Sequence, residues 1–234
     1  MRKNPAMNYA IPAPAITTVP VVGGGDFPVR RIYCVGRNYA AHAREMGHDP
    51  DREDPFFFMK PADAIVANNS EVPYPPMTKD YQHEIELVVA LAKGGSDIPA
   101  AKALDCVFGY AVGLDMTRRD LQGEAKKAGR PWDFGKGFDH AAPCAALSPV
   151  GKVGHLDKKA AIWLEVNGKP RQKSDLSMLI WSVPETIAYL SRYMMLAPGD
   201  LIYSGTPEGV AAVVKGDKLH GHVDGLEDLK ITIV

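Results

Sequence analysis

The chain's clearest hydrophobic pattern is the alternation in Tyr81–Leu91, which predicts a β-strand. Successive strand side chains point to opposite faces, so Ile85 and Leu87 share an apolar face while Glu84 and Glu86 share the other. Residues two apart lie about 7 Å apart along a strand, where like charges repel in a partly buried setting. Either a divalent cation relieves this repulsion, or this is an edge strand with one face in water.

A second predicted strand, Cys106–Asp115, alternates large residues with small ones. The face that ends in Asp115 carries Gly109, Ala111 and Gly113, so it is nearly bare, and we expect room there for a ligand. Thr117 follows as the expected N-cap of a helix that carries Arg118, Arg119 and Gln122.

The remaining pattern predicts more strands than helices. Strands are expected at 31–35, 56–60, 160–166, 201–203 and 230–234, with a hairpin turn at Asn167-Gly168. One helix is expected over 39–46 with Asn38 as N-cap, and another after a capping box at Ser182, with Val183, Ile187, Leu190 and Met194 on one face. Strands and helices do not alternate regularly, which indicates an α+β fold.

The first 25 residues are rich in Pro and Ala and end in three consecutive glycines. They predict an extended N-terminal arm over 1–25, followed by one domain over 26–234. A chain of 234 residues is long enough for a single domain with a substantial core.

The composition argues against several classes of protein. A net charge of −1 without a long basic run gives no indication of nucleic acid or an anionic membrane as partner. No apolar stretch is long enough for a transmembrane helix, and the N-terminus lacks the apolar region of a secretory signal, so we expect a cytoplasmic protein. Cys34, Cys106 and Cys144 are too widely spaced to indicate a disulfide framework or a zinc site.

The candidate metal ligands are carboxylates. Asp115 ends its strand and joins Glu84 and Glu86 as a third acidic ligand, a set that favours Mg²⁺ or Mn²⁺ over zinc. His83 is on the opposite strand face and is interpreted as a packed histidine.

Other polar residues around this set supply donors and a base. His42 and Glu45 are three apart on the first predicted helix and could activate a water, or they are an exposed helix pair. Arg119, Lys136 between two glycines, and Thr206 in the loop 204–209 together offer cationic and donor groups for a carboxylate ligand.

Six ordered motifs resemble the fumarylacetoacetate hydrolase family from about residue 30 to the C-terminus. They are Gly36-Arg-Asn-Tyr-Ala-Ala-His42-Ala-Arg-Glu45-Met, Phe58-Met-Lys60-Pro, His83-Glu84-Ile-Glu86, Gly113-Leu-Asp115 through Gln122, Trp132-Asp-Phe-Gly-Lys136 and Gly205-Thr206-Pro-Glu-Gly. The nearest subgroup resembles bacterial fumarylpyruvate and acylpyruvate hydrolases. The run His220 to Asp228 departs from the family pattern, which puts strand register there in question but not the chemistry.

The resemblance implies a mixed β-sandwich roll with short peripheral helices, a homodimer, and Mg²⁺ or Mn²⁺ held by the three carboxylates. It assigns catalysis to His42, Glu45 and Lys136, with Arg37, Lys60, Arg119, Gln122 and Thr206 binding a small 2,4-dioxo acid. The implied reaction is hydrolysis of a carbon–carbon bond, with fumarylpyruvate as the expected substrate.

Alternatives remain open at this stage. They are a general acylpyruvate hydrolase, an oxaloacetate decarboxylase, a 2-oxo-dienedioate isomerase, and an inactive dicarboxylate-binding protein. The second carboxylate of fumarylpyruvate needs a partner in a buried site. The residues available for it in or beside the motifs are Arg37, Lys60, Arg118 and His140.

Overall fold

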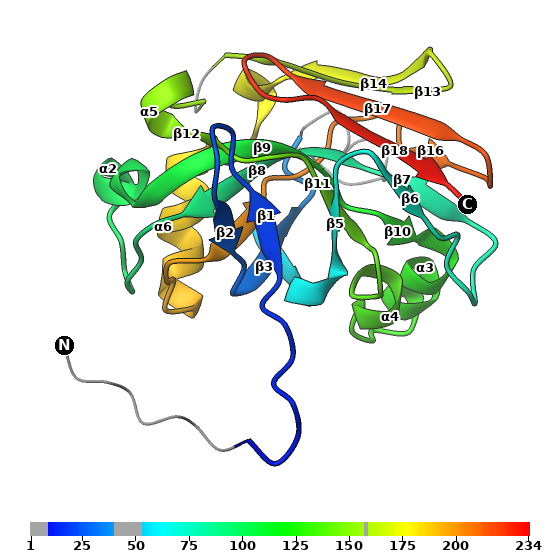
Figure 1. The fold of residues 1–234 in the computed structure, drawn as a ribbon, viewed down its shortest axis with the longest axis horizontal. Coiled ribbons are helices and arrows are strands. Elements are labelled where there is room, and N and C mark those ends of the chain that lie inside the picture. The colour runs from blue at the N-terminus through cyan, green and yellow to red at the C-terminus, as the bar shows by residue number, and fades with distance from the viewer. Residues whose placement is uncertain (1–8, 40–52, 157–158) are drawn as a thin grey trace.

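Two β-sheets packed face to face make up most of the fold, with short helices at their edges (Figure 1). The computed structural model describes residues 9–39, 53–156 and 159–234. The predicted helix over 39–46, with His42 and Glu45, lies outside these ranges apart from its first residue, Tyr39, which forms a bridge with Leu179.

The larger sheet has eight strands within the described ranges and carries the carboxylates. In spatial order its strands are β4 (Phe56–Lys60), β3 (Arg31–Gly36), β15 (Asp200–Tyr203), β8 (Ile85–Leu91), β9 (Val107–Leu114), β11 (Ala142–Cys144) and β5 (Ile65–Ala67), with β12 (Ser148–Pro149) on β9. Two pairs are parallel, β3 with β15 and β5 with β11, so the sheet is mixed. Strand β8 is buried along its whole length because the sheet is covered on both faces.

The second sheet has five strands in the part of the chain that is described. They are β14 (Lys169–Asp175), β13 (Ala161–Val166), β17 (Lys218–Val223), β18 (Leu229–Ile233) and β6 (Ser70–Val72). Strands β13 and β17 contact β8 and β9 of the larger sheet. A Cβ at Gly221 of β17 would lie 3.0 Å from Ile85 Cδ1, so this glycine permits the close approach of the two sheets.

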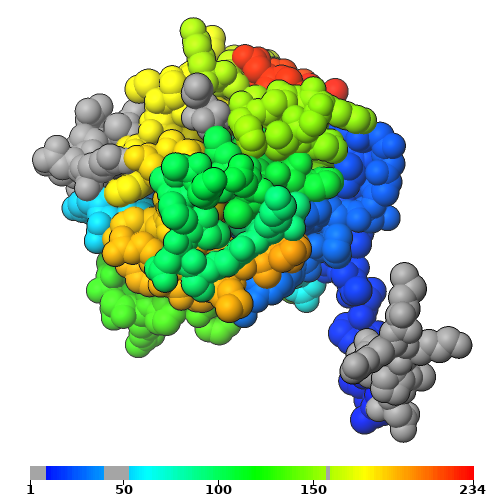
Figure 2. All heavy atoms as spheres, turned by 90° about the vertical axis from the view of Figure 1, so that its left-hand side faces the viewer, coloured from blue at the N-terminus to red at the C-terminus, as the bar shows by residue number. Residues whose placement is uncertain are grey.

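Smaller elements complete the structure. A short sheet of β10 (Thr117–Arg118), β7 (Tyr81–His83) and β16 (Ala211–Ala212) lies beside the carboxylates, and β1 (Thr18–Pro20) pairs with β2 (Asp26–Pro28). The helices are α2 (Ala100–Ala103), α3 (Arg119–Lys127), α4 (Asp133–Lys136), α5 (Val150–Val153) and α6 (Val183–Tyr193), with 3-10 turns at Ala62–Ala64, Leu104–Cys106 and Leu176–Met178. Helices α3 and α4 contact each other, and α2 lies against α6 on the face that Figure 2 shows.

The predicted α+β class with a mixed β-sandwich roll and short helices is confirmed. The predicted hairpin is formed, because Asn167 and Gly168 have φ of 55° and 71°, as a type I′ turn requires. The capping box is also present, since Ser182 N donates to Glu185 Oε2 at 3.0 Å. All three cysteines are buried and unpaired.

Four local expectations differ from the structure. The strand predicted over 81–91 breaks at Glu84, so that β7 and β8 belong to different sheets. Thr117 lies in β10 and does not cap α3, whose N-cap is Arg118. Met194 ends α6 and is 38% exposed, because the helix stops before this position reaches the core.

The fourth difference concerns the glycine-rich face of β9. A Cβ at Gly113 would lie 2.4 Å from Val88 Cγ2 and 2.7 Å from Tyr203 Cε1. The space that we expected to hold a ligand is therefore filled by protein side chains, and the small residues serve close packing.

The N-terminal segment is extended only in part. Residues 9–16 run away from the body of the molecule (Figure 1). From Thr18 the chain forms a hairpin with β2, and Val19 is fully buried. The arm predicted over 1–25 is thus too long at its C-terminal end, where the three glycines form the hairpin turn with positive φ.

The run that departs from the family pattern has regular register. His220 pairs with Lys230 across β17 and β18. The Asp228 carboxylate lies 2.7 Å from His220 Nε2 and 2.6 Å from His222 Nδ1.

No helix among the described residues is long and apolar enough to cross a membrane.

Replacing Gly113 with Ala should lower the free energy of unfolding by about 1–3 kcal/mol, because the new Cβ overpacks the interface with Val88 and Tyr203. Urea unfolding measures the difference. Gly151→Ala in α5 is the matched control, since its Cβ would meet nothing within 4 Å, and it should lose no stability. Equal stability of both variants and the wild type would contradict this account of the β9 face.

Candidate active site

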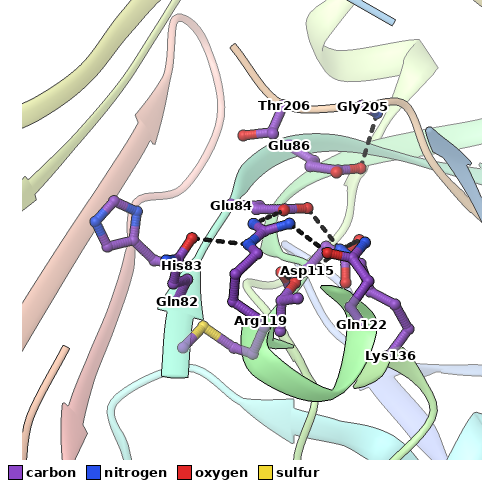
Figure 3. Close-up of polar contacts among 12 residues, drawn as sticks. Gln82, His83, Glu84, Glu86, Asp115, Arg119, Gln122, Lys136, Gly205 and Thr206 are labelled. Carbon is purple, nitrogen blue, oxygen red and sulfur yellow. Dashed lines mark hydrogen bonds and ion pairs between the residues drawn. The ribbon is translucent and has the colours of Figure 1, made fainter. Parts of the chain in front are cut away.

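Three buried carboxylates lie together at the ends of β8 and β9. One oxygen from each of Glu84, Glu86 and Asp115 lies within 4.8 Å of the others. Glu84 occupies the break between β7 and β8, Glu86 is in β8, and Asp115 follows β9. The backbone bond from Asp115 N to Glu84 O, 2.8 Å long, ties the two strand ends together. The sequence-based expectation that these carboxylates meet is confirmed (Figure 3).

The electrostatics of this cluster call for positive charge. Burial raises the pKa of Glu86 well above its usual value, and repulsion from Asp115 and Glu84 raises it further. A hydrogen bond of 2.8 Å from Gly205 N to Glu86 Oε2 works in the opposite direction. Each carboxylate is less than a tenth exposed, so solvent cannot compensate their charges.

The donor set fits a hard divalent cation. Asp115 Oδ1 is buried and accepts no hydrogen bond, although Lys60 Nζ lies 2.8 Å away as an ion-pair partner. An oxygen with lone pairs left over, beside two further carboxylates and no His or Cys in the group, matches the ligands of Mg²⁺ or Mn²⁺.

Lys136 is the most completely bound cation of the site. Its Nζ donates to Glu84 Oε2, Asp115 Oδ2 and Thr117 Oγ1, each at 2.7 Å. Burial alone lowers the pKa of Lys136, but the charges of Asp115 and Glu84 outweigh this and raise it. Lys136 is therefore a charged donor. Thr117, which we expected to cap a helix, orients it instead.

Arg119 holds the other side of Glu84. Its guanidinium forms an ion pair with Glu84 Oε1 and donates to Gln82 Oε1 at 2.8 Å and to Gln122 Oε1 at 2.6 Å. Because Arg119 is bonded at three points, its guanidinium plane is fixed beside the carboxylates (Figure 3).

Lys60 lies elsewhere than the sequence suggested. Its side chain is fully buried, and its Nζ donates to the carbonyls of Met116, at 3.0 Å, and of Lys136, in addition to the ion pair with Asp115. These three partners surround the ammonium group, so Lys60 supports Asp115 from behind the cavity.

A cavity of about 160 Å³ opens onto the carboxylates. Of the predicted site residues, Arg37, Arg119, Gln122, Lys136 and Thr206 line it together with the three carboxylates. Arg37 has φ of 58°, in the left-handed region that non-glycine residues rarely adopt. Arg118 lies with its guanidinium 4.3 Å from the Phe138 ring, and neither it nor His140 is among the described residues that line the cavity.

Gln172 of β14 is a supporting residue that sequence reasoning missed. Its buried amide accepts from Ile85 N at 3.0 Å, and its Nε2 donates to Thr206 Oγ1 at 2.8 Å. It thereby fixes the Thr206 loop against the start of β8. A single glutamine in the polar run Lys169–Asp175 gives no signal of this contact, which exists only because the two sheets pack.

Phe58 and Trp132 form an aromatic wall of the cavity, with ring centroids 5.8 Å apart. Gly123 and Lys126 of α3 also line it. The sequence motifs contained Phe58 and Trp132 without indicating a role, whereas Lys126 and Gly123 fell outside the chemical residues that we singled out. A helical spacing of i, i+4 and i+7 from Arg119 was the signal that could have identified them.

Lys60→Met should lower the free energy of unfolding by about 2–4 kcal/mol, because it removes one of the two ion-pair partners of the buried Asp115 carboxylate and the Lys60 donor to two carbonyls. Denaturant unfolding measures the loss, and Lys215→Met at an exposed position is the control. Unchanged stability combined with a raised KM would show instead that Lys60 contacts substrate directly.

Comparison with known proteins agrees with this geometry. Residues 31–234 match the family model described as fumarylacetoacetate (FAA) hydrolase C-terminal. Fumarylpyruvate hydrolase of Ralstonia sp is 46% identical over 190 residues, which cover 80% of this chain and 98% of that protein. Human mitochondrial oxaloacetate tautomerase FAHD1 is 40% identical over 204 residues, covering 87% and 91%.

A solved structure shows the same fold. The crystal structure of fumarylpyruvate hydrolase from Pseudomonas aeruginosa in complex with Mn²⁺ and pyruvate superimposes with a TM-score of 0.95 at 55% identity, covering 97% of this chain and 99% of that one. The matched fold, the coverage of nearly the whole chain and the buried carboxylates lead to one assignment: this chain belongs to the fumarylacetoacetate hydrolase family.

Proposed function

We propose that this protein is a metal-dependent hydrolase that cleaves a carbon–carbon bond in a 2,4-dioxo acid, converting fumarylpyruvate and water to fumarate and pyruvate. The main support for this proposal is the buried cluster of Glu84, Glu86 and Asp115 at a cavity lined by charged donors. The relative from Pseudomonas aeruginosa, which holds Mn²⁺ and pyruvate, supports both the ion and the product.

Glu84, Glu86 and Asp115 would hold Mg²⁺ or Mn²⁺, which supplies a Lewis acid for the negative charge that develops on the substrate oxygens. Arg119 and Lys136, fixed by their carboxylate partners, face the same region and add positive charge for an anionic substrate. The hydroxyl of Thr206, held by Gln172, remains able to donate a hydrogen bond. Arg37 completes the polar lining.

The reaction needs a base for its water. We assign this role to His42 and Glu45, which lie outside the described residues, on the strength of the family motif that contains them. They would take a proton from water as it attacks the C4 carbonyl, and collapse of the adduct would release fumarate and the enolate of pyruvate. General base assistance contributes typically about 10²–10⁴-fold, so charge stabilisation by the cationic residues must supply much of the remaining rate.

The related tautomerase favours one rival reaction. Oxaloacetate tautomerisation, like the decarboxylation that we considered from the sequence, needs an enolate stabilised at the same carboxylate cluster but no attacking water. A general acylpyruvate hydrolase, a 2-oxo-dienedioate isomerase and an inactive binding protein would use the same cavity. A cytoplasmic homodimer remains our proposal for the protein in the cell, and light scattering in solution tests the dimer.

The purified protein should hydrolyse fumarylpyruvate only with Mg²⁺ or Mn²⁺ present. Its kcat/KM should exceed that for acetylpyruvate by roughly 5- to 150-fold, the effect of leaving a polar partner unpaired. Chelation should abolish turnover, and Asp115→Ala should lose metal binding measured by calorimetry while remaining folded. Full activity after chelation would refute metal dependence, and faster conversion of oxaloacetate than hydrolysis of either acid would favour the rival reactions.

Glu45→Gln should separate binding from chemistry. It removes the proposed base and leaves the three carboxylates intact, so hydrolysis should fall by at least about 10²-fold. Binding of oxalate, a 2-oxo acid analogue, should keep its affinity in calorimetry with Mg²⁺ present. Hydrolysis at the wild-type rate would mean that another group activates the water.

A further inference from the structure

One face of helix α3 follows the cavity outward from the carboxylates. Arg119, Gln122, Gly123 and Lys126 are spaced i, i+3, i+4 and i+7, and all four line the cavity. Arg119 marks the inner end, because it bonds Glu84. Lys126 lies two helical turns further out, about 10 Å along the axis.

The balance of charges around the carboxylates indicates what the outer part of this face can bind. Lys60, Arg119 and Lys136 form ion pairs with Asp115 and Glu84, so three positive charges lie beside the three carboxylates. A divalent ion adds two positive charges, and the 2-oxo acid end of the substrate offsets both in its enolate form. A second carboxylate on the substrate therefore needs positive charge from beyond this inner set, and Lys126 lines the outer cavity.

The length of the helix face fits the length of the substrate. An extended seven-carbon chain with carboxylates at both ends spans roughly 8 Å at about 1.5 Å per bond. The distance along the helix is slightly longer than the substrate, and the flexible Lys126 side chain can reach back over the remainder. Phe58 and Trp132 supply a flat apolar wall for the conjugated part of the chain.

Gly123 leaves the path between the two ends open. A Cβ at this position would meet nothing within 4 Å, although its neighbour Gln122 is buried. Glycine weakens a helix interior relative to alanine, and no close approach of another element requires it here. The missing side chain has its effect in the cavity, where a larger residue would stand between Gln122 and Lys126.

We infer that Lys126 binds the distal carboxylate of a dicarboxylic 2,4-dioxo acid and that Gly123 provides the room for the chain leading to it. This inference rests on the proposed hydrolase function and assigns the specificity of that site. It also replaces three of the cations considered from the sequence, because Lys60 is enclosed behind Asp115 and Arg118 and His140 do not line the cavity.

The test compares Lys126→Met, Lys126→Arg and the control Lys127→Met, whose exposed side chain is not among the described residues that line the cavity. Lys126→Met should lower kcat/KM for fumarylpyruvate by about 5- to 20-fold, the lower range for a charged hydrogen bond because Lys126 is solvent-exposed. Its kcat/KM for acetylpyruvate should change less than about twofold, since that substrate lacks the distal charge. Lys126→Arg should keep most of the preference, and Lys127→Met all of it.

Binding gives a readout that does not depend on turnover. Fumarate, the product that carries the distal carboxylate, should bind Lys126→Met more weakly than wild type in calorimetry, whereas oxalate should bind both equally. The salt dependence of fumarate binding should also be shallower in the variant, because one screened charge is gone.

Gly123→Leu tests the room for the chain. It should reduce fumarylpyruvate hydrolysis at least about tenfold more than acetylpyruvate hydrolysis, and Gly123→Ala should raise the melting temperature, which shows that the helix tolerates a side chain. Equal losses for both substrates, or an unchanged ratio in Lys126→Met, would overturn the inference. If the wild type hydrolyses neither acid, the proposed function fails first, and the fumarate and oxalate binding data still decide the role of Lys126.

Discussion

Burial of three carboxylates in one place is the constraint on which the rest of the site depends. Glu84, Glu86 and Asp115 repel one another where solvent cannot screen them, and burial disfavours their charged forms. The fold compensates with cations placed around the cluster, of which Lys60 and Lys136 are themselves buried. Burying either lysine without a carboxylate partner would cost free energy, so the lysines and the carboxylates stabilise one another's burial.

The sheets provide the rigid frame that this charge arrangement needs. Strand β8 is buried throughout and β9 packs so closely that Gly113 admits no side chain, which fixes Glu86 and Asp115 at adjacent strand ends. The break at Glu84 turns the chain into a second small sheet and brings Gln82 to Arg119. Residues held in this way on strands need little reorganisation when a ligand binds.

The site has an inner and an outer part with different physical roles. In the inner part, Lys60, Arg119 and Lys136 form ion pairs with Asp115 and Glu84, and Asp115 Oδ1 still has lone pairs for a metal ion because it accepts no hydrogen bond. The outer part is formed by Gly123 and Lys126 of α3 and by the aromatic residues Phe58 and Trp132, which contact each other. In our proposal the inner part carries the chemistry, and the outer part discriminates between substrates.

The sequence by itself determined the α+β class, most strands and the hairpin at Asn167, because strand periodicity and turn chemistry are local properties. It also predicted the carboxylate cluster, since strand alternation places Glu84 and Glu86 on one face and the family motifs add Asp115. Only the tertiary structure decided the place of Lys60, the clamp made by Gln172 and the filling of space beside Gly113. Each of these depends on which distant segments meet across the two sheets. A side chain's partner, and therefore its role, is set by that packing and not by its neighbours along the chain.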